Sequence, residues 1–117
     1  MRNFKDYEIW HIAMEIVVEV YQITKKLPDS EKFGLKSQMR RSAVSMPSNI
    51  AEGCSRKSDK AFANFLEISL GSSFELQTQL MVALRVGYLK EEELIDLFEK
   101  LDRFQRKTNT LLGKMSR

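Results

Sequence analysis

The sequence predicts an all-α protein, an up-down-up-down antiparallel four-helix bundle with a proline-kinked second helix. Along four long stretches, apolar residues recur at spacings of three and four, which is the repeat of one helix face. Only short segments separate the stretches, and short connections make consecutive helices antiparallel neighbours. A chain of 117 residues can bury a core without disulfides or metal, so residues 1–117 are predicted to form one domain.

The first predicted helix spans residues 6–26, and its apolar positions exceed the single stripe of an ordinary surface helix. These positions are Ile9, Trp10, Ala13, Met14, Ile16, Val17, Val20, Tyr21 and Ile23. The sequence Leu-Pro-Asp-Ser at residues 27–30 ends the helix, because proline does not continue it.

The second predicted helix follows and runs to about Lys57, with Pro47 in its middle. One apolar stripe runs along it: Leu35, Met39, Ala43, Met46, Ile50 and Cys54. A proline removes one backbone hydrogen bond and presses on the preceding turn. A kink is therefore predicted at residues 43–46.

A polar line lies beside that stripe on the same helix. It consists of Gln38, Ser42, Ser45, Asn49, Glu52 and Arg56. A buried amide or carboxylate without a partner is costly. Asn49 and Glu52 are therefore predicted to be at least partly buried in a structural polar network. Their partners would be neighbouring backbone groups or the side chains of Ser69, Ser72 or Arg56.

The third predicted helix lies between Ser58, an expected N-cap, and Gly87, an expected C-cap. Its core face consists of Phe62, Phe65, Leu66, Ser69, Ser73, Leu76, Leu80, Ala83 and Leu84. Ser69 and Ser73 are small and lie in the middle of this face. The second helix is therefore expected to approach closely there, around residues 43–46.

Leu70, Phe74 and Met81 form a second apolar arc, turned by roughly 100° from the core face of the third helix. One four-helix bundle needs only the first face, so this arc and the excess apolar positions of residues 6–26 predict an oligomer interface. The alternative is a broad core contact with the first helix inside a monomer.

The fourth predicted helix begins at residues 91–93, Glu-Glu-Glu. Its apolar face follows near-heptad steps through Leu94, Phe98, Leu101, Phe104 or Gln105, Thr108, Leu112 and Met115. No Gly/Ser linker, repeat or low-complexity tract interrupts the chain.

Charge gathers at one end of the predicted bundle, although the formal net charge is only +3. Segments 1–8, 52–60 and 103–117 meet there and contain ten basic side chains against four acidic ones, so this end carries +6 and the remainder −3. We call it the basic pole, and it predicts contact with the phosphate backbone of RNA or DNA. The expected contacts are Arg56, Lys57, Lys60, Arg103, Arg106 and Lys107, with Arg41 ranked second. The alternative is that the charges of the fourth helix complement its macrodipole, or that the partner is another acidic molecule.

The sequence contains no recognisable enzyme motif. His11 is the only histidine and has no second ligand at a metal-binding spacing, while Cys54 lies on an apolar stripe without a neighbouring base. There is no Glu-x-x-His pair of the di-iron bundles and no phosphate-binding loop. The chain is therefore predicted to be non-enzymatic, without cofactor or metal.

A cytoplasmic location is expected from three further features. No run of about 20 apolar residues could span a membrane. The first residues lack the apolar run of a secretory signal. Cys54 alone cannot form an intramolecular disulfide, which fits a reducing compartment.

Two long motifs carry a family resemblance: residues 38–53, QMRRSAVSMPSNIAEG, and residues 71–80, GSSFELQTQL. Together with Trp10, and with Leu27-Pro28 followed by Glu31 and Gly34, they resemble the four-helix-bundle proteins encoded in intervening sequences of bacterial 23S ribosomal RNA genes. Met46 stands where that family usually has isoleucine, and Ser42 where alanine is common. The resemblance implies a homopentameric ring without an established biochemical activity.

The chain is also similar to the accessory protein of diversity-generating retroelements, which binds nucleic acid and a reverse transcriptase. Three function classes therefore remain open: an oligomer that binds RNA or DNA, an adaptor for a protein partner, and a self-assembling scaffold that binds neither.

Overall fold

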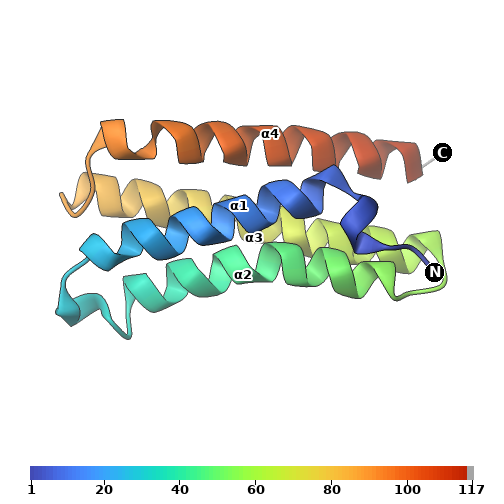
Figure 1. Ribbon diagram of the computed structural model, residues 1–117, viewed down its shortest axis with the longest axis horizontal. Helices are drawn as coiled ribbons and strands as arrows, with labels where there is room; N and C mark the ends of the chain where they lie inside the picture. The colour runs from blue at the N-terminus through green and yellow to red at the C-terminus, as the bar shows by residue number, and fades with distance from the viewer. Residues whose placement is uncertain (116–117) are drawn as a thin grey trace.

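The computed structural model describes residues 1–115, and Figure 1 shows its helices lying along one long axis. The helices are α1 (Glu8–Ile23), α2 (Leu35–Cys54), α3 (Asp59–Arg85) and α4 (Glu91–Met115). Three 3-10 turns accompany them: η1 (Phe4–Asp6), η2 (Thr24–Lys26) and η3 (Asp29–Glu31). The described residues contain no strand, so the predicted all-α four-helix bundle is confirmed.

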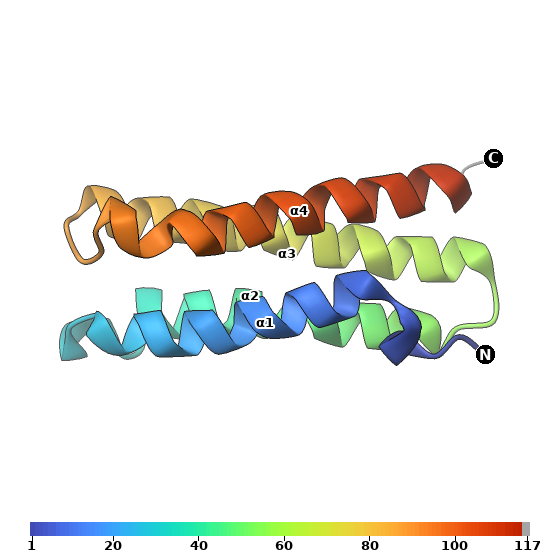
Figure 2. The same ribbon diagram turned by 45° about the horizontal axis from the view of Figure 1, so that its top comes forward.

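The chain reverses direction at each connection (Figures 1 and 2). The N-terminus, the α2–α3 turn and the end of α4 consequently lie at one end of a body that measures 44 × 24 × 19 Å. The α1–α2 and α3–α4 connections lie at the opposite end. Each helix packs on two others, in the order α1, α2, α3, α4 around the bundle.

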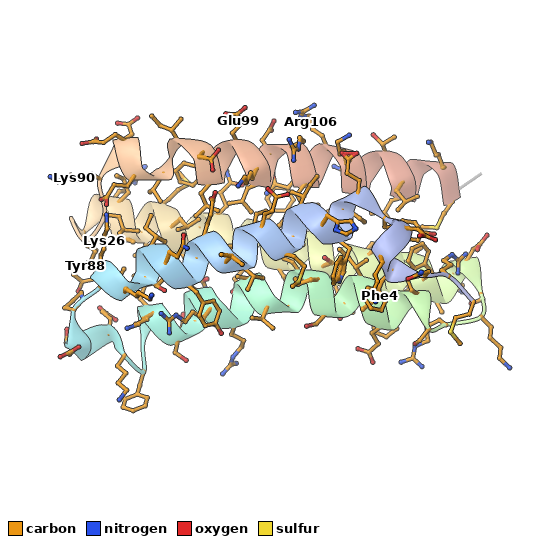
Figure 3. The ribbon with its side chains drawn as sticks, in the orientation of Figure 1. Phe4, Lys26, Tyr88, Lys90, Glu99 and Arg106 are labelled. Carbon is orange, nitrogen blue, oxygen red and sulfur yellow. The ribbon has the colours of Figure 1, made fainter. Side chains whose placement is uncertain are left out.

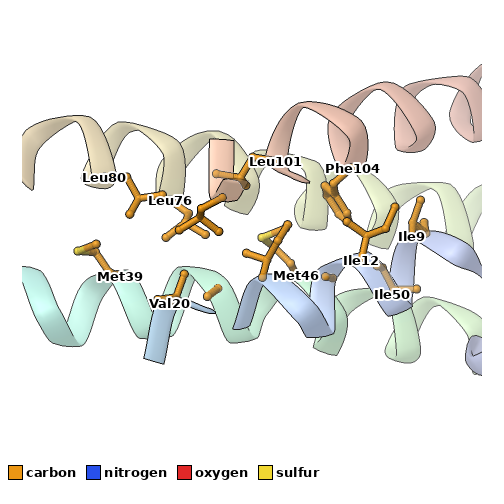
Figure 4. Close-up of a cluster of buried hydrophobic side chains, with 14 of the residues drawn as sticks. Ile9, Ile12, Val20, Met39, Met46, Ile50, Leu76, Leu80, Leu101 and Phe104 are labelled. Carbon is orange, nitrogen blue, oxygen red and sulfur yellow. The ribbon is translucent and has the colours of Figure 1, made fainter. Parts of the chain in front are cut away.

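The core runs along the whole bundle and draws on all four helices. Figure 4 shows Ile12, Ile50, Leu76 and Leu101, one from each helix, directed into the same space. All four side chains are almost completely buried. Burial of large aliphatic side chains of this kind contributes about 1.5–3 kcal/mol each, which makes the core the main source of stability.

Two of the expected helix ends are found in the structure. The Ser58 side chain accepts a hydrogen bond from the Ala61 backbone N–H and so caps the start of α3. At the other end Gly87 has a φ of 86°, and the Tyr88 N–H bonds to the Ala83 carbonyl at 2.9 Å. This is a Schellman-type ending, which a residue with a side chain would strain.

The segment between α1 and α2 is less helical than expected. Helix α1 ends at Ile23 rather than at residue 26, and α2 begins only at Leu35. Leu27 is extended, with a ψ of 147°, because the ring of Pro28 disfavours a helical conformation for the residue before it. Helix α2 also ends at Cys54, three residues before the predicted end.

Helices α2 and α3 approach each other closely at Gly53. A Cβ added to Gly53 would lie 2.8 Å from the Phe65 Cβ and 3.0 Å from Phe62 Cδ1, which is closer than atoms normally pack. Further along the pair, the Ser69 hydroxyl donates to the Met46 carbonyl at 2.8 Å. The close approach expected around residues 43–46 is therefore present, and glycine and serine permit it.

A row of hydrogen bonds, which we call the polar seam, lies where the same two helices face each other. Two of its bonds cross between the helices and two lie within α2. Ser42 donates to the Glu75 carboxylate at 2.5 Å, and the Ser45 and Ser72 hydroxyls share a bond of 2.8 Å. Asn49 is half-buried, and its amide donates to the Ser45 carbonyl and hydroxyl at 2.8 and 2.9 Å. Asn49 thus has the backbone partner expected from the sequence.

The prediction that the Glu52 side chain is partly buried is wrong. Glu52 is exposed, and it pairs with Arg56 at 3.2 Å. Beside it, Gly53 packs closely against Phe62 and Phe65, which leaves little space between the two helices. The carboxylate instead lies along its own helix, toward Arg56 one turn further on. Pro47 is buried inside α2, and the kink predicted there stays a prediction.

Replacing Gly53 by alanine should destabilise the protein by about 1–3 kcal/mol, because the new methyl group would force α2 and α3 apart. Gly71 provides the matched control, since it also lies in a helix but has nothing within 4 Å of the added Cβ. Gly71→Ala should raise stability by about 0.5–1 kcal/mol through helix propensity. Chemical denaturation at one fixed protein concentration measures both; equal stabilities of the two variants would contradict the close contact.

Asn49→Ala should lower the free energy of unfolding by about 0.5–1.5 kcal/mol, because the amide's bonds within the polar seam are lost. A double-mutant cycle with Ser45→Ala isolates the coupling between the two side chains. Additive effects, with no coupling between the two substitutions, would remove Asn49 from the seam and favour a role in surface recognition.

Candidate nucleic-acid interface

The six side chains of the basic pole that are predicted to contact phosphate fall into two groups. Arg56, Lys57 and Lys60 surround the α2–α3 turn, while residues 103–107 lie near the middle of α4. Arg106 projects outward from α4, well short of its end (Figure 3). All six cationic side chains are exposed, in two patches that lie on different elements.

Ion pairs within the chain already engage half of these cations. Arg56 pairs with Glu52, and its Cζ lies 4.8 Å from the centroid of the Phe65 ring. The other two pairs are Arg106 with Asp102 at 2.9 Å and Lys107 with Glu8 at 3.2 Å. Within residues 1–115, the remaining three have no ion pair: Lys57, Lys60 and Arg103.

A hollow of about 660 Å³ lies at the α2–α3 turn. Its lining consists of Met1, Arg2, Ser55, Arg56 and Lys57, without a carboxylate. Arg2 pairs with Asp59 outside the lining, and its Cζ lies 4.3 Å from the Phe62 ring centroid. Three cationic side chains therefore converge where the chain turns.

The charges of α4 change from acidic to basic along the helix. The first turn carries three glutamates and the last turn carries Lys114, with Arg103, Arg106 and Lys107 between. Acidic residues at a helix N-terminus and basic residues toward its C-terminus interact favourably with the macrodipole. This effect acts within the first and last turns, so it accounts for the three glutamates and Lys114 but not for the three cations between them. In the patch at the α2–α3 turn, Arg56 has partners in Glu52 and Phe65, whereas Lys57 and Lys60 have no ion pair within residues 1–115.

Arg41 lies apart from both patches. It is exposed on the first half of α2, near the opposite end of the bundle, and it lines a second hollow there. Lys32, Lys36 and Arg40 line the same hollow. Sequence reasoning did not connect these residues, although their spacing of about one helical turn was a signal that could have done so.

A partly buried cluster of ion pairs joins α1 to α4 and has a structural role. The Lys100 ammonium lies 2.6 Å from Glu19, 3.3 Å from Glu15 and 3.3 Å from Asp96. Partial burial raises the pKa of Glu19, while hydrogen bonding to Glu19 raises the pKa of Lys100. The opposite charges satisfy each other, so the cluster holds two helices together.

The two candidate reactive side chains, Cys54 and His11, are held in structural contacts. Cys54 is buried, and desolvation raises the pKa of its thiol, which keeps the thiol protonated. The His11 ring forms a 2.7 Å hydrogen bond with the Lys5 carbonyl. Among the described residues, no three acidic, cysteine or histidine side chains are grouped to hold a metal ion.

The residues of the predicted oligomer interface lie along the outer side of α3. Phe74 and Met81 are 51% and 43% exposed, and Leu70 is half-buried. Phe74 and Met81 are therefore in contact with water in the single chain, and their burial against a second copy stays a prediction. No helix within residues 1–115 is both long enough and apolar enough to cross a bilayer.

Comparison with known proteins supports the fold and gives a family. A crystal structure of a protein of unknown function from the S23 ribosomal protein family of Bacteroides thetaiotaomicron VPI-5482 superimposes with a TM-score of 0.82. The two chains are 23% identical over 89% of this chain and 97% of the other. No curated protein sequence matches. The sequence profile of the 23S rRNA-intervening sequence proteins matches residues 5–110, and the chain belongs to that family.

Proposed function

We propose that this protein is a non-enzymatic, self-associating bundle that binds the phosphate backbone of RNA or DNA through the α2–α3 turn. The observation that carries the proposal is the hollow at the turn, whose lining contains three cationic side chains and no carboxylate. Phosphate attraction of this kind is independent of base sequence and depends strongly on salt.

The two kinds of cation at the turn would contribute differently. Stacking of Arg56 on Phe65 fixes its planar guanidinium, which suits bidentate contact with a phosphate. Lys57 and Lys60 are exposed and add point charges. The Glu52–Arg56 pair is solvent-exposed and therefore weak, so an arriving phosphate can replace the carboxylate.

Replacing Arg56, Lys57 and Lys60 together by glutamine should weaken binding to all sequences alike. Three phosphate contacts correspond to a log–log salt slope of about −2 to −3, and the variant should lose that part of the slope. The matched control is Arg103, Arg106 and Lys107 replaced by glutamine, which removes the same charge from α4. Fluorescence anisotropy with labelled RNA and DNA measures both affinities.

Equal losses in the two variants would assign binding to the six cations as a whole rather than to the turn. Wild-type protein that binds neither RNA nor DNA at about 50 mM salt would contradict the nucleic-acid proposal. The chain would then be a protein–protein adaptor or a self-assembling scaffold.

The exposed arc of Leu70, Phe74 and Met81 supports self-association, in which the arc packs against a second copy of the chain. The expected assembly is a homopentamer, the state that the family resemblance implies. Phe74→Glu should leave a helical protein that no longer assembles, because a charge in a desolvated interface costs several kcal/mol unless paired. Light scattering measures the size. Ile95→Glu is the control, since Ile95 is 61% exposed on α4, outside the arc. A wild type that is monomeric at tens of micromolar would refute the oligomer.

A further inference from the structure

A second cationic surface lies at the end of the bundle that is opposite to the α2–α3 turn. A hollow of about 770 Å³, which we call the α1–α2 hollow, opens beside the connection between α1 and α2. Its cationic lining consists of Lys32, Lys36, Arg40 and Arg41. Asp29 is the single carboxylate among the lining residues, so the surface carries a marked excess of positive charge.

Helix stability does not explain these charges. Lys36 lies in the first turn of α2, and Arg40 and Arg41 follow within the next turn. The N-terminal end of a helix carries partial positive charge, so cations there are unfavourable. Lys36 and Arg40 are also four residues apart on one face, where like charges repel. The macrodipole therefore disfavours Lys36, and it is too weak beyond the first turn to account for Arg40 and Arg41.

Arg40 is held as a fixed positive charge. Its Nε donates to the Thr24 hydroxyl at 2.9 Å, and its Nη2 donates to the Tyr21 carbonyl at 3.2 Å. The guanidinium also covers the Tyr21 ring, with Cζ 4.5 Å from the ring centroid. All these partners are neutral, and Arg40 has no ion pair within residues 1–115. An anion in the hollow would meet a half-buried cation whose geometry is already set.

An aromatic ring stands beside the cations. Phe33 is 88% exposed, and the Lys32 ammonium lies 5.5 Å from its ring centroid. At this exposure the ring contributes little to the core and is accessible to a ligand. Aromatic rings interleaved with cations are the pattern by which proteins hold single strands, because bases stack on the rings while phosphates contact the cations.

We propose that the α1–α2 hollow binds a segment of single-stranded RNA or DNA. One base stacks on Phe33, and the adjoining phosphates contact Lys32, Lys36 and Arg41 around the fixed guanidinium of Arg40. A duplex fits less well, since its base faces are covered by their neighbours. This inference rests on the proposed function, from which it takes nucleic acid as the class of ligand. What it adds is that the ligand is single-stranded and that it binds at the α1–α2 hollow, a site separate from the α2–α3 turn.

The test is anisotropy with labelled oligothymidylate of about 15 nucleotides, alongside a duplex of equal length. Lys32, Lys36 and Arg41 replaced together by glutamine should flatten the log–log salt slope for the single strand by about 2. Phe33→Leu, which keeps an apolar side chain but removes the ring, should weaken single-strand binding about tenfold and leave duplex binding unchanged. Arg40 is left intact because it ties α2 to α1.

The charge-matched control replaces Lys25, Lys90 and Lys114 by glutamine. All three are exposed and lie outside both hollows, and Lys90 belongs to the same end of the bundle (Figure 3). This control should bind the single strand nearly as the wild type does. Circular dichroism confirms that each variant keeps its helices.

Binding that is lost equally in the control and in the hollow variant would overturn the site, because net charge alone would then explain it. Single-strand binding that is unaffected by the hollow variant but lost with the α2–α3 turn variant would overturn this inference and leave the proposed function standing. Absence of nucleic-acid binding overturns both. Polyglutamate that competes as well as oligothymidylate would also overturn it, in favour of an acidic protein partner.

Discussion

Gly53 brings the backbone of α2 against Phe62 and Phe65 of α3, with room for nothing larger than a hydrogen atom between them. Two turns away, the Ser69 hydroxyl bonds to the Met46 carbonyl, so the two helices are fixed at more than one level. The polar seam adds hydrogen bonds between the two helices, from Ser42 to Glu75 and between Ser45 and Ser72. Helices α1 and α4 pack their apolar faces on α2 and α3. The ion cluster around Lys100 then links α1 to α4.

The same contact decides which side of α2 remains free. The apolar stripe faces the core and the polar seam faces α3, and together they occupy most of the helix circumference. Charged residues on the remaining side must lie in solvent, because a buried unpaired charge is costly. Lys36 and Arg41 lie on that side, while Arg40 is drawn back onto Tyr21. The position of the cationic surface therefore follows from the packing of α2.

Local signals were readable from the sequence, and so was the close approach of α2 to α3, but most individual side-chain pairs between helices were not. Ser58 and Gly87 could be placed because a cap depends on residues within one turn of it. The predicted grouping of the basic residues depends on how far each lies from the end of the bundle. Each helical residue adds 1.5 Å, so Arg103 lies about 18 Å before the end of α4, and its contact with phosphate stays a prediction. Pairs such as Lys107 with Glu8 depend on the packing of distant segments, which no local pattern records.

The two hollows lie at opposite ends of a bundle 44 Å long, which is several times the Debye length of about 8 Å at physiological salt. Charges at one end are therefore screened from those at the other, and substitutions at the two ends should act additively. In a cyclic assembly, symmetry presents each hollow in the same way on every copy. Weak sites at each end would then be repeated around the ring, and a long strand could bind several of them at once. The overall affinity would then depend on the number of sites bound together rather than on one strong site.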